Sequence, residues 1–318
     1  MKNVAVTGAS GYLGQQLISR LEHDDSVERI IGISRRAPKV SSSKLKFYSH
    51  DIREPFDKIF AENNIDTAVH LAFVVSAARD VKAAHATDVG GSKNFLDACK
   101  SASVRQVLFL SSYTAYGAYP DGPQAIGEDT PLRPNAGFQY PYHKAEADKM
   151  FQEFMRQNPD ICVSVLRAVA VAGPASDGGP LASFLRNPVS VRIKGYDPLW
   201  QFVHEDDLIE LTVLLLKNGH KGVFNVAGEG AILYSEMLTK IGKRCLTLPN
   251  KVSAFITNLT WYLHLQSESP GGKSSDILMY PIVLNTEKVK KETGFQFKHT
   301  GREAFQSFLD AAKKRAKK

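Results

Sequence analysis

The sequence predicts an α/β fold in which a doubly wound parallel sheet is followed by a smaller C-terminal domain. Two observations predict it. Short apolar runs alternate with helical patterns through the first half of the chain, which is typical of parallel strands joined by helices. A glycine-rich turn joins the first run to the first helix, at residues 7–14. The alternation ends after Gly173-Pro174, so we place the boundary of the first domain at residue 173.

The first strand and helix flank the glycine turn. Residues 4–6 are apolar, and from residue 12 to 21 the apolar side chains recur at helical spacing. The turn between them carries Gly8, Gly11 and Gly14. A strand, a glycine turn and a helix together direct backbone N–H groups and the helix dipole at a phosphate. The three glycines then permit a tight turn, the approach of a pyrophosphate and close packing of helix on strand, which predicts a Rossmann-type dinucleotide site.

The remaining elements of the first half follow in order. We expect further strands at residues 28–34, 45–48, 67–72, 106–110 and 162–166. We expect helices at residues 54–64, 80–101 and 140–156. Right-handed crossovers between these strands place helices on both faces of the sheet.

Residues 174–318 mainly form the predicted second, substrate-binding domain, while residues 203–227 return to the first sheet as a helix and a strand. We expect residues 175–200 to be mostly loop with a short helix. Residues 250–282 show no regular pattern, and residues 301–315 predict a closing amphipathic helix.

Residues 252–265 are unusually aromatic and apolar. Three interpretations stay open for this segment: it lines an apolar substrate pocket, it lies against a membrane, or it is a core helix of the small domain.

The net charge of +7 is concentrated at the C-terminal end. Residues 287–318 hold ten Lys or Arg and four acidic residues, so the rest of the chain is nearly neutral. This distribution favours a solvated basic tail and predicts no nucleic-acid partner.

Cysteine usage and apolar run lengths bear on location. Cys99, Cys162 and Cys245 are odd in number, far apart and match no metal-ligand spacing, so we expect reduced thiols, no metal site and a cytoplasmic protein. The longest apolar runs, such as residues 211–216, are too short to cross a bilayer, so we expect no stable membrane insertion.

The end of the second predicted strand selects the dinucleotide. An acid there accepts the ribose 2′-hydroxyl, whereas arginine accommodates a 2′-phosphate. This chain places Ser34, Arg35 and Arg36 there, and guanidinium groups pair well with phosphate. We therefore favour NADP over NAD, with the alternative that both arginines are simply exposed after a strand.

Tyr140 and Lys144 are four residues apart at the start of a predicted helix and so share one face. A free phenol has a pKa of about 10, too high for a base at neutral pH. We expect the Lys144 ammonium to lower the pKa of Tyr140, so that the phenol exchanges a proton while a nicotinamide exchanges a hydride. Ser111 and Ser112 end the fifth strand at the same sheet edge. For His70, at the end of the fourth strand, a core role and a ligand role stay open.

The motifs together resemble those of the extended short-chain dehydrogenase/reductases, including the NAD-dependent epimerase/dehydratase branch. The resemblance covers most of the chain and is densest before Gly173. It rests on the turn at 7–14, Asp51-Ile52, His70-Leu71-Ala72, residues 111–117, Tyr140 with Lys144, Leu166-Arg167, Gly173-Pro174, residues 202–207 and residues 224–228.

The resemblance implies roles for individual residues. Tyr140 is implied as the proton donor or acceptor, Lys144 as its tuner and ribose contact, and Ser112 as the partner of the substrate oxygen, with Thr114 nearby. Asp51 is implied near the adenine. The predicted catalytic residues are Ser112, Tyr140 and Lys144, and the predicted substrate residues are Ser112 and Thr114. The predicted cofactor-binding residues are Gly8, Ser10, Gly11, Tyr12, Leu13, Gly14, Ser34, Arg35, Arg36, Asp51, Ile52, Leu71, Ala72, Phe73, Ser111, Tyr140, Lys144 and Ala168. A homodimer through the helices near 80–101 and 140–156 is also implied.

The chain departs from the family pattern in several places. The usual Asn-Val-x-Gly-Thr on the long helix is Asp-Val-Gly-Gly-Ser at residues 88–92. Ala168 follows Arg167 where proline or tyrosine is frequent, and Ala170 stands where epimerases often place an asparagine on the nucleotide diphosphate. This last change weakens the case for a UDP-sugar substrate. We expect His204, with Asp206 and Asp207, to join the two domains rather than to catalyse.

Three functions are compatible with the sequence. The first is an NADP-preferring oxidoreductase that acts on a secondary alcohol or carbonyl of a small molecule. The second is a sugar-nucleotide epimerase or dehydratase with tightly bound NAD. The third is a cofactor-sensing binding protein, against which an intact Ser112, Tyr140 and Lys144 set argues.

Overall fold

The computed structural model describes residues 1–75, 78–137, 139–176, 180–187, 189–265 and 274–316. Its centre is a seven-stranded, wholly parallel sheet in the order β3-β2-β1-β4-β5-β6-β11. The strands are β1 (Asn3–Thr7), β2 (Arg29–Ser34), β3 (Leu45–Ser49), β4 (Thr67–His70), β5 (Gln106–Ser112), β6 (Cys162–Ala168) and β11 (Gly222–Val226). The predicted doubly wound sheet is confirmed.

The strand order reverses beside β1, and this reversal positions the site. The chain goes from β1 outward to β2 and β3, then returns to the other side of β1 as β4. Thr7 pairs with Ile33 on one side and with His70 on the other, so the three strands end in one row. Ligands of open α/β sheets bind in the crevice outside such a reversal, beyond the carboxyl ends of the strands.

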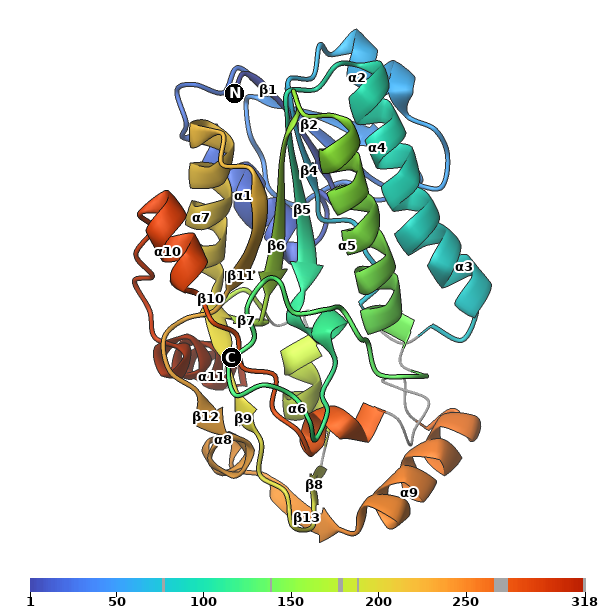
Figure 1. The fold of residues 1–318 in the computed structure, drawn as a ribbon, viewed down its shortest axis with the longest axis vertical. Helices are drawn as coiled ribbons and strands as arrows, with labels where there is room; N and C mark the ends of the chain where they lie inside the picture. Colours follow the sequence, from blue (N-terminus) through green and yellow to red (C-terminus); the bar gives the residue numbers. More distant parts are fainter. Residues whose placement is uncertain (76–77, 138, 177–179, 188, 266–273, 317–318) are drawn as a thin grey trace.

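Helices cover both faces of the sheet, as Figure 1 shows. On one face lie α1 (Tyr12–Glu22) and α7 (Glu205–Asn218); on the other lie α2 (Asp57–Glu62), α4 (Gly91–Ser101) and α5 (Gln139–Gln157). Each face has its own apolar core, because parallel strands bury both of their faces. In the core beneath α5, the rings of Phe109 and Phe151 stack with centroids 4.3 Å apart.

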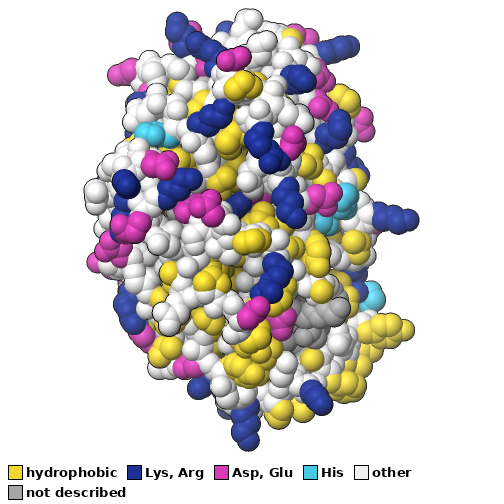
Figure 2. All heavy atoms as spheres, viewed as in Figure 1, with side chains coloured by type: hydrophobic (Ala, Val, Ile, Leu, Met, Phe, Trp, Pro, Cys, Tyr) yellow, Lys and Arg dark blue, Asp and Glu magenta, His cyan; other side chains and the backbone are white. Residues whose placement is uncertain are grey.

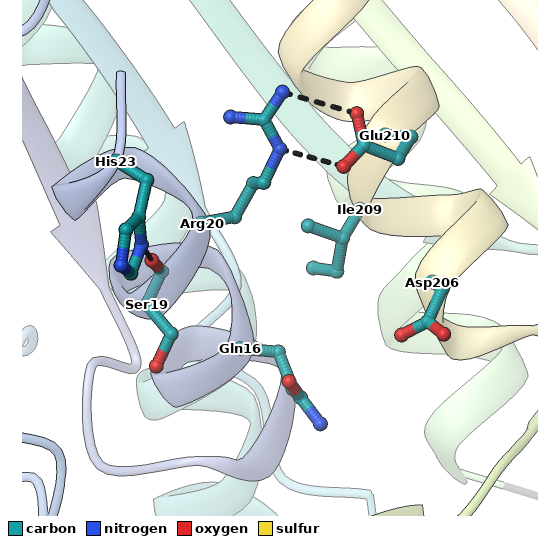
Figure 3. A pocket seen from close by; sticks show the side chains of 7 residues that line it. All are labelled: Gln16, Ser19, Arg20, His23, Asp206, Ile209 and Glu210. Atoms are coloured by element: carbon teal, nitrogen blue, oxygen red, sulfur yellow. Dashed lines mark hydrogen bonds and ion pairs between the residues drawn. The ribbon is translucent and has the colours of Figure 1, made fainter. Parts of the chain in front are cut away.

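A polar contact joins α1 to α7 on the first face. Arg20 of α1 donates two hydrogen bonds to Glu210 of α7, at 2.6 and 3.2 Å. Figure 3 shows this pair at the hollow between the two helices, with Gln16, Asp206 and Ile209 on its walls. None of the predicted site residues lines this hollow.

The long helix predicted over 80–101 is interrupted. Asp80 caps α3 (Val81–His85), which passes into a π-helical turn at Ala86–Gly90 and then into α4. A π-turn holds one extra residue and often occurs at functional sites. Here the turn carries Asp88, whose side chain is almost completely buried.

The second half of the chain forms a third core. Phe202, Tyr234 and Phe305 are fully buried there. Its helices are α6 (Ser183–Arg186), α8 (Tyr234–Ile241) and α11 (Gly301–Ala316), and its strand pairs are β7 (Ala170–Ala172) with β10 (Phe202–His204), β9 (Leu199–Trp200) with β12 (Ile232–Leu233), and β8 (Val189–Ile193) with β13 (Arg244–Leu248). The expected loop at 175–200 therefore contains strands as well as α6, while residues 177–179 and 188 lie outside the described residues.

Two segments of the second half pack with the first. The strand β11 pairs with β6, and α10 (Glu287–Thr293) packs on β11. Val289 of α10 lies in the same apolar core as α1 and α7. The division at residue 173 stays a prediction.

The expectation of an irregular segment at 250–282 is wrong for its first part, because α9 (Asn250–Tyr262) forms after Pro249. Its apolar side chains face outward: Phe255 is 67% exposed and Tyr262 is 80% exposed. Figure 2 shows hydrophobic side chains gathered where Figure 1 draws α9. A core helix would bury these residues, so that interpretation is wrong. Lining a pocket and contacting a membrane stay predictions, and no described helix is long and apolar enough to cross a bilayer.

The packing of α1 on the glycine turn predicts a stability difference between two helical glycines. A Cβ on Gly14 would lie 2.3 Å from the carbonyl oxygen of Gly8, whereas a Cβ on Gly90 would meet nothing within 4 Å. We expect Gly14→Ala to lower the free energy of unfolding by about 1–3 kcal/mol through overpacking. Gly90→Ala should leave it unchanged or raise it by up to about 1 kcal/mol. Urea denaturation of both variants measures this, and equal effects would contradict the packing role.

Candidate active site

The glycine turn lies directly against the end of β4. Gly8 has a φ of +73° and donates its N–H to the carbonyl of Ile33 at 2.9 Å. A Cβ on Gly8 would lie 2.8 Å from the backbone nitrogen of Ala72, so the turn admits no side chain there. Gly11 donates to the carbonyl of Gly8 at 2.9 Å and is the N-cap residue of α1. The tight-turn and close-packing roles of Gly8 and Gly14 therefore have a direct structural basis.

The amino end of α1 suits a pyrophosphate. No described side chain caps this helix. The N–H groups of Tyr12, Leu13 and Gly14 have no acceptor within the helix, and they carry the positive end of its dipole. Ser10 precedes them in the turn, where its carbonyl accepts a hydrogen bond from Gln15. A dinucleotide phosphate fits this backbone cradle at the point where the strand order reverses.

The residues predicted to bind the adenine ribose and the adenine are more exposed than the glycine turn. Ser34 is buried and its hydroxyl donates to the carbonyl of Arg36 at 2.7 Å, while the side chains of Arg35 and Arg36 are exposed. Asp51 forms a bidentate ion pair with Arg53, which lowers the pKa of its carboxyl.

Beyond Asp51, Ile52 is buried and lies beneath Gly91 of α4. The cofactor roles of residues 34–36, 51 and 52 stay predictions.

His70 is a core histidine. Its Nδ1 is 2.8 Å from Oγ1 of Thr7, its Nε2 is 3.1 Å from Oγ of Ser92, and its ring stacks on Phe109. Burial lowers its pKa to about 3, so the ring is neutral at pH 7. Of the two roles left open by the sequence, the core role is confirmed.

Lys144 is held between β5, the segment after β4 and α5. Its Nζ donates to the carbonyl of Leu110 at 2.5 Å. The same Nζ lies 3.7 Å from the ring centroid of Phe73 and 4.7 Å from that of Phe109, within cation–π range. It is 5.9 Å from the ring centroid of Tyr140, whose edge meets Phe73. The fold therefore brings Phe73, Tyr140 and Lys144 into one cluster.

Three hydroxyl groups meet beside this cluster. The hydroxyls of Ser112 and Thr114 are 2.9 Å apart, at the carboxyl end of β5. A hydrogen bond between Ser112 and the Tyr140 phenol acts to lower the pKa of the phenol. The structure thus gathers the predicted Ser112, Thr114, Tyr140 and Lys144 at one edge of the sheet.

The expected lowering of the pKa of Tyr140 by Lys144 is wrong in this structure. Burial raises the pKa of Tyr140 to about 12, and the carboxylate of Asp88 adds to this effect. Burial lowers the pKa of Lys144 to about 7, against the opposing influence of Asp88 and Asp148. Desolvation disfavours the charged form of each group, and it is the largest influence on both pKa values. The phenol is therefore neutral at pH 7 and is set up as a proton donor.

Ser111 points into a buried polar network rather than toward Ser112. Its hydroxyl donates to Asp148 of α5 at 2.6 Å, and Asp148 forms a bidentate ion pair with Arg167 at 2.9 and 3.0 Å. Arg167 also donates to the hydroxyl of Tyr116, which donates to Asn225. Leu166-Arg167 and Phe224-Asn225 therefore hold α5, β6 and β11 together, and the cofactor role predicted for Ser111 stays untested.

Asp88 and His143 are site residues that the sequence reasoning did not assign. Nδ1 of His143 and the carboxylate of Asp88 are 2.8 Å apart, and both side chains are buried. The available signal was the acid at position 88 in place of the family's usual asparagine. Its partner could not be found by spacing, since 55 residues separate the two.

The motif at 202–207 joins distant segments, as expected. His204 caps α7 by accepting from the N–H of Asp206, and its Nε2 lies 3.2 Å from Ser307 of α11. Asp207 accepts the N–H groups of Lys298 and His299 at 3.0 Å each. Ala168, predicted to contact the cofactor, is buried opposite Val226 in the sheet. Within the described ranges, no three His, Cys, Asp or Glu side chains gather in a metal-like group.

The fold and the clustered Ser, Tyr and Lys side chains define an extended short-chain dehydrogenase/reductase. The model of the NAD dependent epimerase/dehydratase family matches residues 4–227, and the chain belongs to this family. It is an enzyme that works with a nicotinamide dinucleotide.

Two individual proteins with a similar sequence share less than a third of their residues with this chain. The chain is 29% identical to an uncharacterized protein of Mycobacterium tuberculosis, over 97% of this chain and 83% of that one. It is 29% identical to a UDP-glucose 4-epimerase of Lactobacillus helveticus, over 70% of this chain and 76% of that one.

The fold is also that of a solved structure, the Bordetella bronchiseptica enzyme WbmG in complex with NAD. Its TM-score is 0.76 at 20% identity, over 98% of this chain and 94% of that one.

Proposed function

We propose that this enzyme transfers a hydride at a secondary alcohol or carbonyl of a small organic molecule, with Tyr140 as the general acid/base. The observation that carries the proposal is the cluster of Ser112, Tyr140 and Lys144 at the carboxyl edge of the sheet. A neutral phenol and a serine hydroxyl are the donors that a carbonyl oxygen needs as it gains negative charge.

In the reducing direction, the substrate carbonyl oxygen accepts hydrogen bonds from Ser112 and Tyr140. With its pyrophosphate held by the glycine turn, a bound dinucleotide would supply the hydride that the carbonyl carbon accepts. Tyr140 gives its O–H proton to the oxygen, which completes the alcohol. This proton transfer leaves Tyr140 as a phenolate. The ammonium form of Lys144 stabilises that phenolate. The oxidising direction reverses each of these steps.

A second candidate is internal oxidation and reduction of a sugar nucleotide, as in an epimerase. The Lactobacillus helveticus relative named as a UDP-glucose 4-epimerase favours it. Ala170 argues against it, because a methyl group cannot donate to a nucleotide diphosphate. We therefore place net oxidation or reduction first.

We propose NADP as the preferred dinucleotide. The exposed Arg35 and Arg36 follow β2, next to the buried Ser34, and none of the three offers a carboxylate that would repel a 2′-phosphate. The family name and the NAD complex of WbmG favour NAD instead, so the preference depends on these side chains of the present chain.

We further propose a homodimer through α4 and α5 and a cytoplasmic location. The dimer follows the family resemblance, and the exposed Val81 and Tyr142 near these helices suit an interface. The location follows from the reduced cysteines, of which Cys99 is buried.

Loss of the Tyr140 hydroxyl should abolish turnover while leaving the fold intact. We expect Tyr140→Phe to lower kcat by about 10²–10⁴-fold, because it removes the general acid/base. The dissociation constant of the dinucleotide, followed by fluorescence titration, should change little. Tyr142→Phe is the matched control, since this tyrosine lies on the same helix and is 45% exposed. Strong residual turnover in Tyr140→Phe would refute the proposed role.

The fate of the nicotinamide separates the two candidate functions. We expect purified enzyme to exchange added dinucleotide freely and to change nicotinamide absorbance in step with a carbonyl or alcohol substrate. Dinucleotide that stays bound through purification, together with an epimerised sugar nucleotide and no net absorbance change, would establish the second candidate instead. Chromatographic product analysis is needed for that arm of the test.

The dinucleotide preference should depend on the two arginines. Replacing Arg35 and Arg36 together by Ala should weaken NADP binding by about 10-fold or more, since each charge-assisted hydrogen bond contributes about 1.5–3 kcal/mol. NAD binding should change less than about twofold. Arg29→Ala, at the opposite end of β2, is the control. Equal weakening of both dinucleotides in an isothermal titration would show that the arginines do not read a 2′-phosphate.

A further inference from the structure

We infer that Asp88 and His143 form a positioning pair that fixes Tyr140 and Lys144 on α5 and provides the buried negative charge facing Lys144. This inference rests on the proposed function, because it assigns supporting residues to the same site.

Asp88 connects three elements of the site. One carboxylate oxygen accepts the N–H of Val74 at 2.7 Å, and the other meets Nδ1 of His143 at 2.8 Å. Val74 follows Phe73, whose ring lies under the Lys144 ammonium. The π-turn that bears Asp88, the segment after β4 and α5 are thus tied together through one side chain.

His143 lies on α5 directly before Lys144 and three residues after Tyr140. Its Nδ1 is committed to Asp88, which sets the rotation of α5 relative to the π-turn. The ring of His143 meets that of His85 edge to face, with centroids 5.2 Å apart. His85 in turn is 3.1 Å from the carboxylate of Glu146, so α3 and α5 have a second, exposed contact.

Several charged or titratable groups face Lys144, and among them the carboxylate of Asp88 favours its ammonium form. Asp148 also faces Lys144, but its carboxylate forms a bidentate ion pair with Arg167. His70 faces Lys144 from β4 and is neutral at pH 7. Both carboxylates favour the ammonium form of Lys144, and the contribution of Asp88 is the larger of the two.

Asp88 stands where the family pattern has an asparagine, and this difference adds a negative charge. An asparagine at position 88 could accept the N–H of Val74 through its amide oxygen, but it would carry no charge. An aspartate keeps that bond and adds a charge within reach of both Tyr140 and Lys144. Burying a carboxylate is costly unless it is hydrogen-bonded and paired, and His143 and Val74 supply those partners.

The test is the isosteric Asp88→Asn variant, compared with wild type and with Glu146→Gln, which neutralises an exposed acid on α5. Without the Asp88 charge the pKa of Lys144 should fall. The alkaline limb in the pH profile of kcat/KM should then shift to lower pH by about one unit. At pH values above the limbs of both wild type and variant, kcat/KM of the variant should be about tenfold lower than that of wild type. Glu146→Gln should leave the limb in place.

A second readout does not use turnover. In protein labelled with ¹³Cε-lysine, the Lys144 resonance is assigned with Lys144→Arg, and its titration is compared between variants. We expect the midpoint to fall in Asp88→Asn and to stay unchanged in Glu146→Gln. Because no substrate is needed, this result stands even if the proposed reaction is wrong, whereas failure of Tyr140→Phe to lose activity would refute the reaction alone.

Coincident Lys144 titrations in Asp88→Asn and wild type would overturn the inference. A uniform loss of activity at every pH, with an unmoved limb, would also overturn it by showing a merely structural role. Should Asp88→Asn fail to fold, the double variant Asp88→Asn/His143→Gln places two neutral amides in the same pair and removes the same charge. The same shift is expected there.

Discussion

The site depends on a lysine ammonium that the fold buries between β5 and α5. Water cannot solvate Lys144 there. The charge of its ammonium group is stabilised instead by the carbonyl of Leu110, by the faces of Phe73 and Phe109, and by two carboxylates. These partners come from four places, which are β5, the segment after β4, the π-turn and α5 itself. Sheet, helix layer and the segment after β4 must therefore be assembled before Lys144 can stabilise a phenolate.

The two carboxylates facing Lys144 are used differently. Asp148 is neutralised by Arg167, and this pair extends through Tyr116 to Asn225, which holds the late strand β11 in the sheet. Asp88 is held instead by His143 and a backbone N–H, so its charge remains directed at the catalytic cluster. One acid thus serves the assembly of the sheet, and the other serves the chemistry at its edge.

The glycine turn and the catalytic cluster are coupled through the end of β4. Gly8 approaches the backbone of Ala72 so closely that no side chain fits, and the next residue is Phe73, which contacts Lys144 and Tyr140. The glycine turn and Tyr140 are therefore placed relative to each other by two consecutive residues, Ala72 and Phe73. A dinucleotide held by its pyrophosphate at the turn would therefore lie on the same edge of the sheet as Tyr140.

Much of this molecule could be predicted from the sequence. Local periodicity identified the strands of the first sheet, and the glycine spacing located the turn, because both depend on neighbours in the chain. Tyr140 and Lys144 could be paired because four residues on a helix bring two side chains to one face. The apolar character of residues 252–263 was visible too, but its exposure on α9 was not, since composition does not say what covers a helix.

The sequence by itself determined the order of strands and helices, the position of the glycine turn and the pairing of Tyr140 with Lys144 on one helix face. Only the tertiary structure decided the protonation states and the supporting partners. Burial, which is a property of the assembled core, raises the pKa of Tyr140 to about 12 and lowers that of Lys144 to about 7. The same assembly brings Asp88 to His143 across 55 residues, a contact that no local spacing encodes.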